Sequence, residues 1–302
     1  MTERISLRGA GLRLGYHGAT VVEDGRIVLR PGQVTALVGP NGSGKSTLLR
    51  ALARLHRPET GTVTLDDGAS ALDLAPRDFA RRVTLLAQSR PTPGGVRVQD
   101  VVGYGRHPYR GRWRAGDPDG AAAIARAMEL TGVAAMAGRP VDELSGGELQ
   151  RVWLATCLAQ DTGVLLLDEP TTFLDLRYQV ELLELVRDLA DLHDVAVGVV
   201  LHDLNQAAEI ADQVVLLCQG RVRAEGPPAE VLTEALLTGT YGIRIEATRD
   251  PRTGVVRTRP IGRHTEPTRE RPAIAEPAAS APAHPAAHPA AAASAAAQPA
   301  PA

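Results

Sequence analysis

The chain has 302 residues, which is enough for one large domain or two small ones. Hydrophobic residues make up 44% of the chain, so a sizeable core can form. The formal net charge of −2 excludes a protein that is basic throughout, as a general nucleic-acid coat would be.

Residues 1–88 predict strands and turns around one central loop and the helix that follows it. The runs Ile5–Arg8, Arg26–Leu29 and Gly61–Leu65 favour short strands. No apolar stretch follows Met1, so we expect no secretory signal peptide.

The central loop fits a phosphate-binding motif. Its sequence, Gly39-Pro-Asn-Gly-Ser-Gly-Lys-Ser-Thr47, matches G-x-x-x-x-G-K-[ST] between the apolar run Val34–Val38 and the helix-favouring run Leu48–Leu52. The glycines let backbone N–H groups turn toward an anion, and the following helix adds its dipole. We expect Lys45 to reach the β- and γ-phosphates of a nucleotide and Ser46 to hold Mg²⁺. The residues expected around the phosphates are Gly39, Pro40, Asn41, Gly42, Ser43, Gly44, Lys45, Ser46 and Thr47.

Residues 89–160 differ in character and predict a helical subdomain. Pro91–Gly95 is a cluster of helix and strand breakers, and helical stretches are expected near 97–104 and 119–131. A second anion-binding sequence follows, Leu144-Ser-Gly-Gly-Glu-Leu-Gln-Arg151, where a helix is expected over Glu148–Leu158. One ATP does not need two such loops from one chain, so the second loop predicts that another copy of the protein closes over the nucleotide.

Residues 161–218 return to alternating strands and helices, which implies a mainly parallel sheet. The expected elements are strands at Val164–Leu167, Val195–Leu201 and Val214–Leu217 and helices at Tyr178–Leu192 and Leu204–Ala211. Asp168 and Glu169 close the first of these strands, where neighbouring side chains point to opposite sides and can take different roles. Gly220–Gly226 predicts a hairpin return, followed by a short helix over Pro228–Leu237.

The end of the chain has a different composition. After Glu276 only Ala, Pro, Ser, His and Gln occur, so nothing can be buried to offset the entropy of ordering. We expect residues 265–302 to be disordered. His284 and His288 have the i, i+4 spacing of a helical metal site, but the proline after each one breaks that helix, which favours a solvated tail.

The two cysteines and the hydropathy of the chain indicate in which cellular compartment it works. Cys157 and Cys218 lie among apolar residues without metal-ligand spacing, which favours reduced core thiols in a cytoplasmic protein. No run approaches the ~18 apolar residues of a spanning helix. Any role at a membrane must then depend on a separate subunit.

Together, these motifs resemble the ATP-binding cassette (ABC) ATPases over roughly residues 4–245. The family signature Leu-Ser-Gly-Gly-Gln/Glu is matched by Leu144–Glu148 and sits opposite the phosphate loop of a partner subunit. The resemblance implies an α/β fold with a RecA-like phosphate-loop core, an antiparallel β subdomain and a helical signature subdomain. The implied boundaries are residues 1–245 for this domain, about 89–160 for its helical subdomain, 246–264 for a C-terminal extension and 265–302 for the tail.

The resemblance also implies roles for residues at the strand ends. Asp168 matches the aspartate that organises Mg²⁺, and Glu169 matches the residue that polarises the attacking water. Gln88, after the expected strand Val83–Ala87, matches the Q-loop glutamine that touches Mg²⁺ and the water and links the site to the transporter. His202 matches the switch histidine that contacts the γ-phosphate.

The remaining implied nucleotide contacts are more scattered. Tyr16, which lies 23 residues before Gly39, matches the aromatic residue that stacks on adenine. Thr172–Asp175 matches the D-loop that crosses the dimer interface, with Phe173 larger than the residue often found there. The implied contacts from these segments and from the partner's signature are Tyr16, Ser145, Gly146, Gly147, Glu148 and Asp175.

Three classes of function compete. The signature excludes an ordinary phosphate-loop kinase or GTPase. A soluble ABC protein of ribosomes or DNA usually has two cassettes or a long coiled coil, whereas this chain has one phosphate loop and only 55 residues between Gln88 and Leu144. We therefore expect a transport ATPase that binds ATP and Mg²⁺, pairs head to tail with a second copy and docks on a permease at the cytoplasmic face of the membrane. A substrate-binding protein is an indirect partner, and no nucleic acid is expected.

The segment after the Q-loop suggests the cargo. Asp100–Trp113, together with Asp168–Leu176 and His202–Ala207, is similar to importers of iron–siderophore complexes, haem and cobalamin. We expect a ferric siderophore, with haem or cobalamin as alternatives. Arg106 and Tyr109 are expected to dock on the permease, because Arg and aromatic side chains are enriched at interface hot spots.

Overall fold

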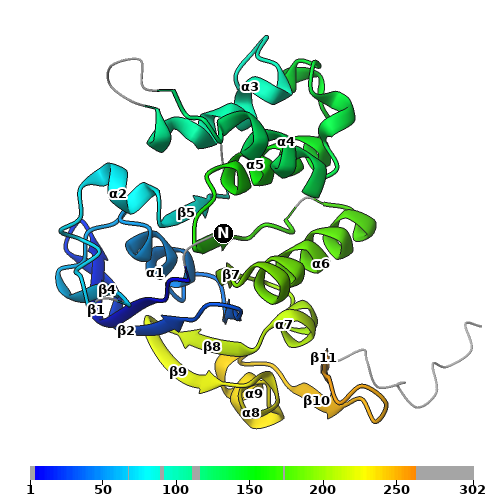
Figure 1. Cartoon of the computed structure of the whole chain (residues 1–302). Coiled ribbons are helices and arrows are strands. Elements are labelled where there is room, and N and C mark those ends of the chain that lie inside the picture. The colour runs from blue at the N-terminus through cyan, green and yellow to red at the C-terminus, as the bar shows by residue number, and fades with distance from the viewer. Residues whose placement is uncertain (1–3, 67, 89–91, 111–115, 173, 263–302) are drawn as a thin grey trace, which may run out of the picture. The chain divides into compact units, whose positions relative to one another are not determined.

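A computed structural model describes residues 4–66, 68–88, 92–110, 116–172 and 174–262 (Figure 1). Its main sheet has the strand order β4-β1-β2-β9-β8-β3-β7-β6-β5. The strands are β1 Leu7–Tyr16, β2 Ala19–Leu29, β3 Val34–Val38, β4 Thr60–Leu65, β5 Val83–Leu86, β6 Val164–Asp168, β7 Ala196–Val200, β8 Gln213–Cys218 and β9 Arg221–Gly226. The helices are α1 Lys45–Leu52, α2 Pro76–Ala80, α3 Val98–Val102, α4 Gly120–Leu130, α5 Gly146–Ala159, α6 Leu176–His193, α7 Leu204–Ile210, α8 Pro228–Val231 and α9 Glu234–Tyr241.

The sheet has a parallel centre and antiparallel strands at one side. β3 pairs in parallel with β7 and β8, and β6 pairs in parallel with β5 and β7. β1 pairs antiparallel with both β2 and β4, and β8 pairs antiparallel with β9. The α/β fold with an antiparallel β subdomain that the sequence predicted is confirmed.

The central strands are apolar at nearly every position because both faces of the sheet are covered. Every residue of β3, β6 and β7 is buried. Val34, Ala36 and Val38 pack with the core that includes α6 and α7, whereas Leu37 packs with the core that includes α1 and the antiparallel strands. Figure 1 shows these helices on opposite sides of the sheet. The parallel pairing of these strands places their carboxyl ends at one edge of the sheet.

The helical subdomain has a core of its own, built on valines of α3 and on apolar residues of α4 and α5. The second helix of this part is α4, and its buried side chains are Ala123, Ala127 and Met128, while Leu130 is 40% exposed. A 3₁₀ helix, Gly103–Tyr109, follows α3.

Arg106 is part of this core, so the prediction that it docks on a permease is wrong. Its side chain is 4% exposed and pairs with Asp117 through two contacts of 2.6 and 2.9 Å. It also donates to the carbonyl of Ala159 at 3.0 Å, and its guanidinium lies 3.8 Å from the centre of the Tyr109 ring. Trp113, at the end of the same expected docking segment, lies outside the described residues.

The C-terminal part differs from the sequence-based expectation in two ways. Two helices, α8 and α9, replace the single helix expected over Pro228–Leu237, because Thr233 caps a new helix by accepting from the backbone N–H of Leu236. A two-stranded antiparallel sheet, β10 Ile245–Arg249 and β11 Val256–Pro260, then follows. These strands belong to the same compact unit as the main sheet, which extends to Gly262. The domain boundary at residue 245 stays a prediction, and the expected disordered tail lies outside the described residues.

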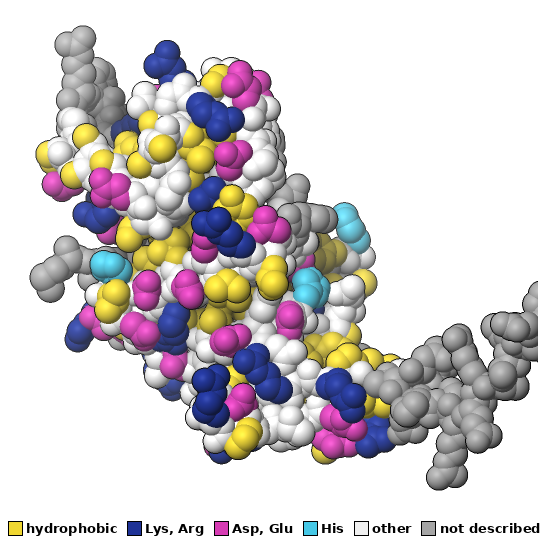
Figure 2. All heavy atoms as spheres, turned by 90° about the vertical axis from the view of Figure 1, so that its right-hand side faces the viewer, with side chains coloured by type: hydrophobic (Ala, Val, Ile, Leu, Met, Phe, Trp, Pro, Cys, Tyr) yellow, Lys and Arg dark blue, Asp and Glu magenta, His cyan; other side chains and the backbone are white. Residues whose placement is uncertain are grey.

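The polarity of the described part can be followed along its helices and over its surface. None of its helices combines the length and the apolarity needed to cross a bilayer. Figure 2 shows Lys and Arg side chains interspersed with Asp and Glu on one face of the protein. Neither cysteine forms a disulfide within the described residues, and Cys157 is buried while Cys218 is half-buried.

Replacing Arg106 with Ala would leave the Asp117 carboxylate, itself only 11% exposed, without its partner. We expect Arg106→Ala to lower the free energy of unfolding by about 3–5 kcal/mol, the usual cost of breaking a buried ion pair. Urea denaturation followed by circular dichroism measures this loss. Arg126→Ala is the matched control, because its 3.6 Å pair with Asp161 is half-exposed and should contribute at most about 1 kcal/mol. Equally small losses in both variants would contradict a buried structural role for Arg106.

Candidate active site

The candidate site is a hollow of about 380 Å³ at the carboxyl ends of the parallel strands. Ligands of open α/β sheets bind at this edge. The hollow is lined by residues from the loop after β3 and from the ends of β5, β6 and β7, namely Val21, Asn41, Gly42, Gly44, Lys45, Ser46, Thr47, Gln88, Glu169 and His202. Segments as far apart in the sequence as Val21 and His202 therefore meet around one space.

The loop after β3 requires glycine at two positions. Gly39 has φ 145°, and a Cβ atom there would lie 2.1 Å from the carbonyl oxygen of Leu217. Gly44 has φ 99°, and a Cβ atom there would lie 2.6 Å from a methyl carbon of Val22. The backbone of Ser43 donates to the carbonyl of Pro40 at 3.2 Å, which closes the turn behind the lining residues.

Lys45 is held over this turn. Its ammonium group donates to the carbonyl oxygens of Gly39 at 2.8 Å and Pro40 at 2.9 Å. Burial lowers the pKa of Lys45 below its usual range, while the carboxylates of Glu169 and Asp168 oppose this shift. An anion bound in the hollow would favour the charged form in the same way.

Ser46 and Asp168 form the second polar pair of the site. The hydroxyl of Ser46 donates to Asp168 Oδ1 at 2.7 Å, and a guanidinium nitrogen of Arg50 lies 3.4 Å from Asp168 Oδ2. Asp168 is the last residue of β6 and is almost fully buried. Hydroxyl and carboxylate oxygens are the ligands that Mg²⁺ prefers, so the adjacent pair fits that ion.

Glu169 connects the other two strand ends. Its Oε1 lies 2.7 Å from His202 Nε2, and its Oε2 accepts a hydrogen bond from the side-chain amide of Gln88. Glu169 lies just beyond the end of β6, and its backbone is left-handed with φ 54°. This conformation separates its carboxylate from that of Asp168. Alternation along one strand predicted that the Asp168 and Glu169 side chains point apart. The left-handed backbone of Glu169 separates them instead.

The signature residues lie elsewhere in this chain. Ser145 caps α5, and the Glu148 carboxylate accepts from its backbone N–H and its hydroxyl, both at 2.8 Å. These bonds lower the pKa of Glu148. Gly146 is exposed in the first turn of α5, and Gly147 faces the ring of Tyr178. None of these residues is among those lining the hollow.

Asp175 and Tyr16 are also outside the lining. Asp175 caps α6 by accepting from the backbone N–H of Tyr178 at 3.0 Å. Tyr16 is 41% exposed, and its ring centre lies 4.4 Å from that of His56. Phe173 lies outside the described residues. The structure thus brings together the phosphate loop, Gln88, the two carboxylates and His202, and it leaves the signature, Asp175 and Tyr16 apart from them.

Two contacts of the site escaped the sequence reasoning. Arg50 lies one helical turn after Ser46, and this i, i+4 spacing was the signal that both could reach Asp168. Tyr241 lies about 200 residues from the loop, where no local pattern indicates contact. Its hydroxyl oxygen accepts a hydrogen bond from the backbone of Gly39, which by itself lowers the pKa of the phenol. Burial outweighs this effect and raises that pKa to about 12.

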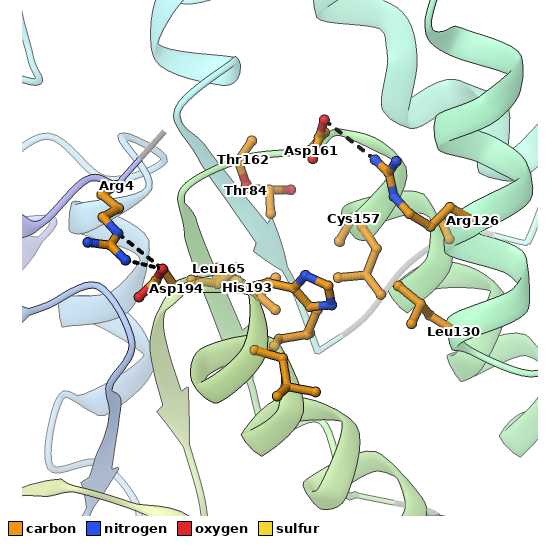
Figure 3. A pocket seen from close by; sticks show the side chains of 15 residues that line it. Arg4, Thr84, Arg126, Leu130, Cys157, Asp161, Thr162, Leu165, His193 and Asp194 are labelled. Carbon is orange, nitrogen blue, oxygen red and sulfur yellow. Dashed lines mark hydrogen bonds and ion pairs between the residues drawn. The ribbon is translucent and has the colours of Figure 1, made fainter. Parts of the chain in front are cut away.

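A larger cavity, of about 800 Å³, lies at the opposite ends of the parallel strands (Figure 3). Its labelled side chains include two ion pairs, Arg4 with Asp194 at 2.6 Å and Arg126 with Asp161 at 3.6 Å. It lies between the helical subdomain and the sheet. No residue that the sequence assigned to nucleotide binding or catalysis lines it, so its size does not make it the active site.

Known proteins resemble this chain in sequence and in structure. The sequence profile described as ABC transporter matches residues 22–172. The ferric enterobactin transport ATP-binding protein FepC of Escherichia coli K12 is 44% identical over 267 residues, which covers 87% of this chain and 97% of FepC. The hemin import ATP-binding protein HmuV of Rhodococcus jostii is 45% identical over 250 residues, or 83% of this chain and 84% of HmuV. A solved structure described as a metal-chelate type ABC transporter, in an inward-facing conformation, has a TM-score of 0.74 at 25% identity over 87% of this chain and 99% of that one.

The burial of the Tyr241 phenol predicts a pH effect. An unfolded tyrosine ionises near pH 10, whereas Tyr241 in the folded protein stays protonated to about pH 12. Between these values the unfolded state binds fewer protons, so the wild type loses free energy of unfolding as pH rises. Tyr241→Phe keeps the ring but lacks this titration. Urea midpoints at about pH 9 and about pH 11 should therefore fall more in the wild type than in the variant, and parallel falls in both proteins would contradict the burial of the phenol.

Proposed function

The chain belongs to the ABC transporter family of ATP-binding proteins, and from this premise we propose that it hydrolyses ATP to drive import of a ferric siderophore through a separate membrane permease. The observation that carries the proposal is the meeting of Gln88, Glu169 and His202 beside Lys45 and Ser46 in one hollow. A site that only bound a small molecule would not need a carboxylate held by an amide and an imidazole beside a phosphate loop. The arrangement suits attack by water on a bound phosphate.

Three side chains of the hollow, Lys45, Glu169 and His202, have distinct parts in that reaction. Lys45 exchanges its contacts with two loop carbonyls for oxygens of the β- and γ-phosphates. Glu169 polarises a water molecule by accepting its proton, and the water oxygen bonds to the γ-phosphorus as the bond to the ADP oxygen breaks. His202 holds the carboxylate of Glu169 in place and faces the γ-phosphate. The charge that develops is stabilised by groups that are already positioned.

Mg²⁺ is the metal that the site fits. Ser46 and Asp168 would hold it through oxygen atoms, with the side chain of Gln88 at the same hollow. When bound, the ion neutralises negative charge on the β- and γ-phosphates.

A second copy of the chain completes the site. Ser145 and Gly146 are exposed at the start of α5, a helix of 14 residues whose first turn offers free backbone N–H groups to an anion. They do not line the hollow of their own chain. In a head-to-tail pair with two-fold symmetry, each signature faces the phosphate loop of the partner, and Asp175 lies at the interface.

The proposed cargo rests on the relatives. The proposed contact with the permease rests on an exposed side chain after the Q-loop. FepC and HmuV are named for ferric enterobactin and hemin, and the alignment with FepC covers more of both chains. A siderophore is therefore the first choice and haem the alternative, with cobalamin after them. Because Arg106 is buried, the docking residue we propose is Tyr104, an aromatic side chain that is 49% exposed in the same segment. The protein then sits at the cytoplasmic face of the membrane through its permease.

The role of Glu169 is tested by Glu169→Gln. The amide cannot accept the proton of the water, so steady-state ATP hydrolysis should fall at least about 100-fold, while the contacts to the phosphates remain. The variant should also form a dimer in size-exclusion chromatography when Mg-ATP is present. Glu181→Gln is the matched control, because Glu181 makes an exposed ion pair with Arg177 on α6. Turnover near that of the wild type in Glu169→Gln would remove the assigned role.

Cargo and docking are tested by uptake in a strain that lacks this chain. Wild-type protein should restore uptake of radiolabelled ferric enterobactin, and Tyr104→Ala should restore little of it while keeping the ATPase activity of the isolated subunit. Leu55→Ala, at an apolar side chain outside the docking segment that is at least as exposed as Tyr104, is the control. Full uptake with Tyr104→Ala would remove the docking residue. If deletion leaves siderophore uptake normal and abolishes uptake of hemin or cobalamin, the transport function stands and the cargo is wrong.

A further inference from the structure

We propose that Asn205 is a positioning residue for ATP hydrolysis, and that the hairpin β10–β11 holds it so that the first turn of α7 keeps His202 against Glu169. The inference rests on the hydrolytic function proposed above. It gives the C-terminal hairpin, which carries no motif residue, a part in the reaction.

Asn205 joins α7 to the hairpin through its side-chain amide. Its Nδ2 donates to the carbonyl oxygen of Thr258 at 3.2 Å. Its Oδ1 accepts from the backbone N–H of Thr258 at 2.7 Å and from the hydroxyl of the same residue at 3.2 Å. The amide thus pairs with both main-chain groups of Thr258, as a neighbouring strand would.

The main-chain groups of Thr258 face α7 rather than the other strand of the hairpin. Thr258 is the register partner of Ala247 in β10, and in an antiparallel pair such positions alternate between bonding to the partner strand and pointing outward. Since both groups of Thr258 bond to Asn205, the contact uses the outer edge of β11. Breaking it would leave the ladder between β10 and β11 intact.

The hairpin is a firm support. Ile245 at the start of β10 and Val256 at the start of β11 are 3% and 6% exposed, and both belong to the core that includes α6 and α7. The backbone N–H of Ile245 also donates to the hydroxyl of Thr238 on α9 at 3.0 Å. A side chain tied to this hairpin is therefore tied to the core of the domain.

The first turn of α7 is fixed on its other side as well. The side chain of Gln206 donates to Gln179 at 2.9 Å and accepts from the hydroxyl of Thr171 at 3.1 Å. Gln179 in turn donates to the carbonyl oxygen of Leu174. These contacts join the turn to the segment that runs from Glu169 to the α6 cap Asp175.

The position of His202 depends on this turn. Leu201, the residue before it, is held at the end of β7 by a backbone bond to Leu37 at 3.2 Å. Asp203, the residue after it, caps α7 by accepting from the backbone N–H of Asn205 at 2.7 Å. The His202 side chain itself is 45% exposed, so its backbone rather than surrounding packing places it against Glu169. A small misplacement of a group that orients the reaction lowers the rate strongly.

The test uses the full chain and steady-state ATP hydrolysis. Asn205→Ala should lower kcat about tenfold, which corresponds to about 1.4 kcal/mol, because the turn loses its tie to the hairpin. KM for ATP should stay within about twofold, because the phosphate loop is untouched. Thr258→Ala is the matched control, since it removes only the hydroxyl contact and keeps both main-chain bonds, and its kcat should match that of the wild type.

Two further variants separate this role from a loss of folding. Thr258→Pro removes the N–H that bonds to Asn205 and leaves α7 unchanged, and proline is tolerated at a strand edge, so kcat should fall in the same way at a retained thermal midpoint. In a His202→Ala background, measured under single-turnover conditions, Asn205→Ala should cause no further loss, because both changes act through one residue.

The outcomes are distinct. Wild-type kcat in both Asn205→Ala and Thr258→Pro would overturn the inference, and so would a full additional loss in the His202→Ala background. If the wild-type protein itself hydrolyses no ATP, the proposed function fails instead.

Discussion

The carboxylate of Glu169 is the contact on which the site depends. It accepts from Gln88 at the end of β5 and pairs with His202 at the end of β7, while its own residue follows β6. Three neighbouring strand ends are thereby tied to one side chain. This geometry requires parallel strands in the order β7-β6-β5, buried on both faces so that their carboxyl ends lie at one edge. The left-handed backbone of Glu169 then directs its carboxylate away from that of Asp168, which leaves Asp168 to Ser46.

Local sequence determines much of this site, and long-range pairing determines the rest. The phosphate loop and the buried strands were predictable because their glycine spacing and apolar runs are read within about ten residues. Arg106 shows the limit. Its basic, aromatic segment has the composition of a docking surface, yet Asp117 and Tyr109 surround the guanidinium and bury it. The hairpin β10–β11 was missed for a similar reason, since its strands alternate few apolar with many polar residues and are stabilised by core contacts of Ile245 and Val256.

The helical subdomain and the sheet have largely separate cores, and this affects how firmly the two parts are joined. The helical subdomain buries its own apolar cluster, and α5 contributes to both this cluster and the sheet core through opposite faces. Elsewhere the two parts are separated by the large cavity of Figure 3, whose rim carries half-exposed ion pairs. The junction also includes hydrogen bonds from Arg77 on α2 and from Arg81 just after it to the carbonyl oxygen of Pro108. One shared helix and a few polar contacts beside a cavity resist relative movement less than a continuous core does. Ser145 and Gly146, at the start of α5, lie on the helical subdomain, so they can shift without disturbing the sheet.

The C-terminal segment touches both loops that handle phosphate. Tyr241 at the end of α9 contacts the backbone of Gly39 in the phosphate loop, and Thr258 in β11 holds Asn205 beside the switch histidine. The two contacts approach the hollow from one C-terminal segment that the core anchors at Leu237 and Ile245. A movement of this segment would therefore reach the loop after β3 and the turn that carries His202 together. The physical link between them is a rigid element outside the hollow, which explains how residues without any motif can matter to the chemistry.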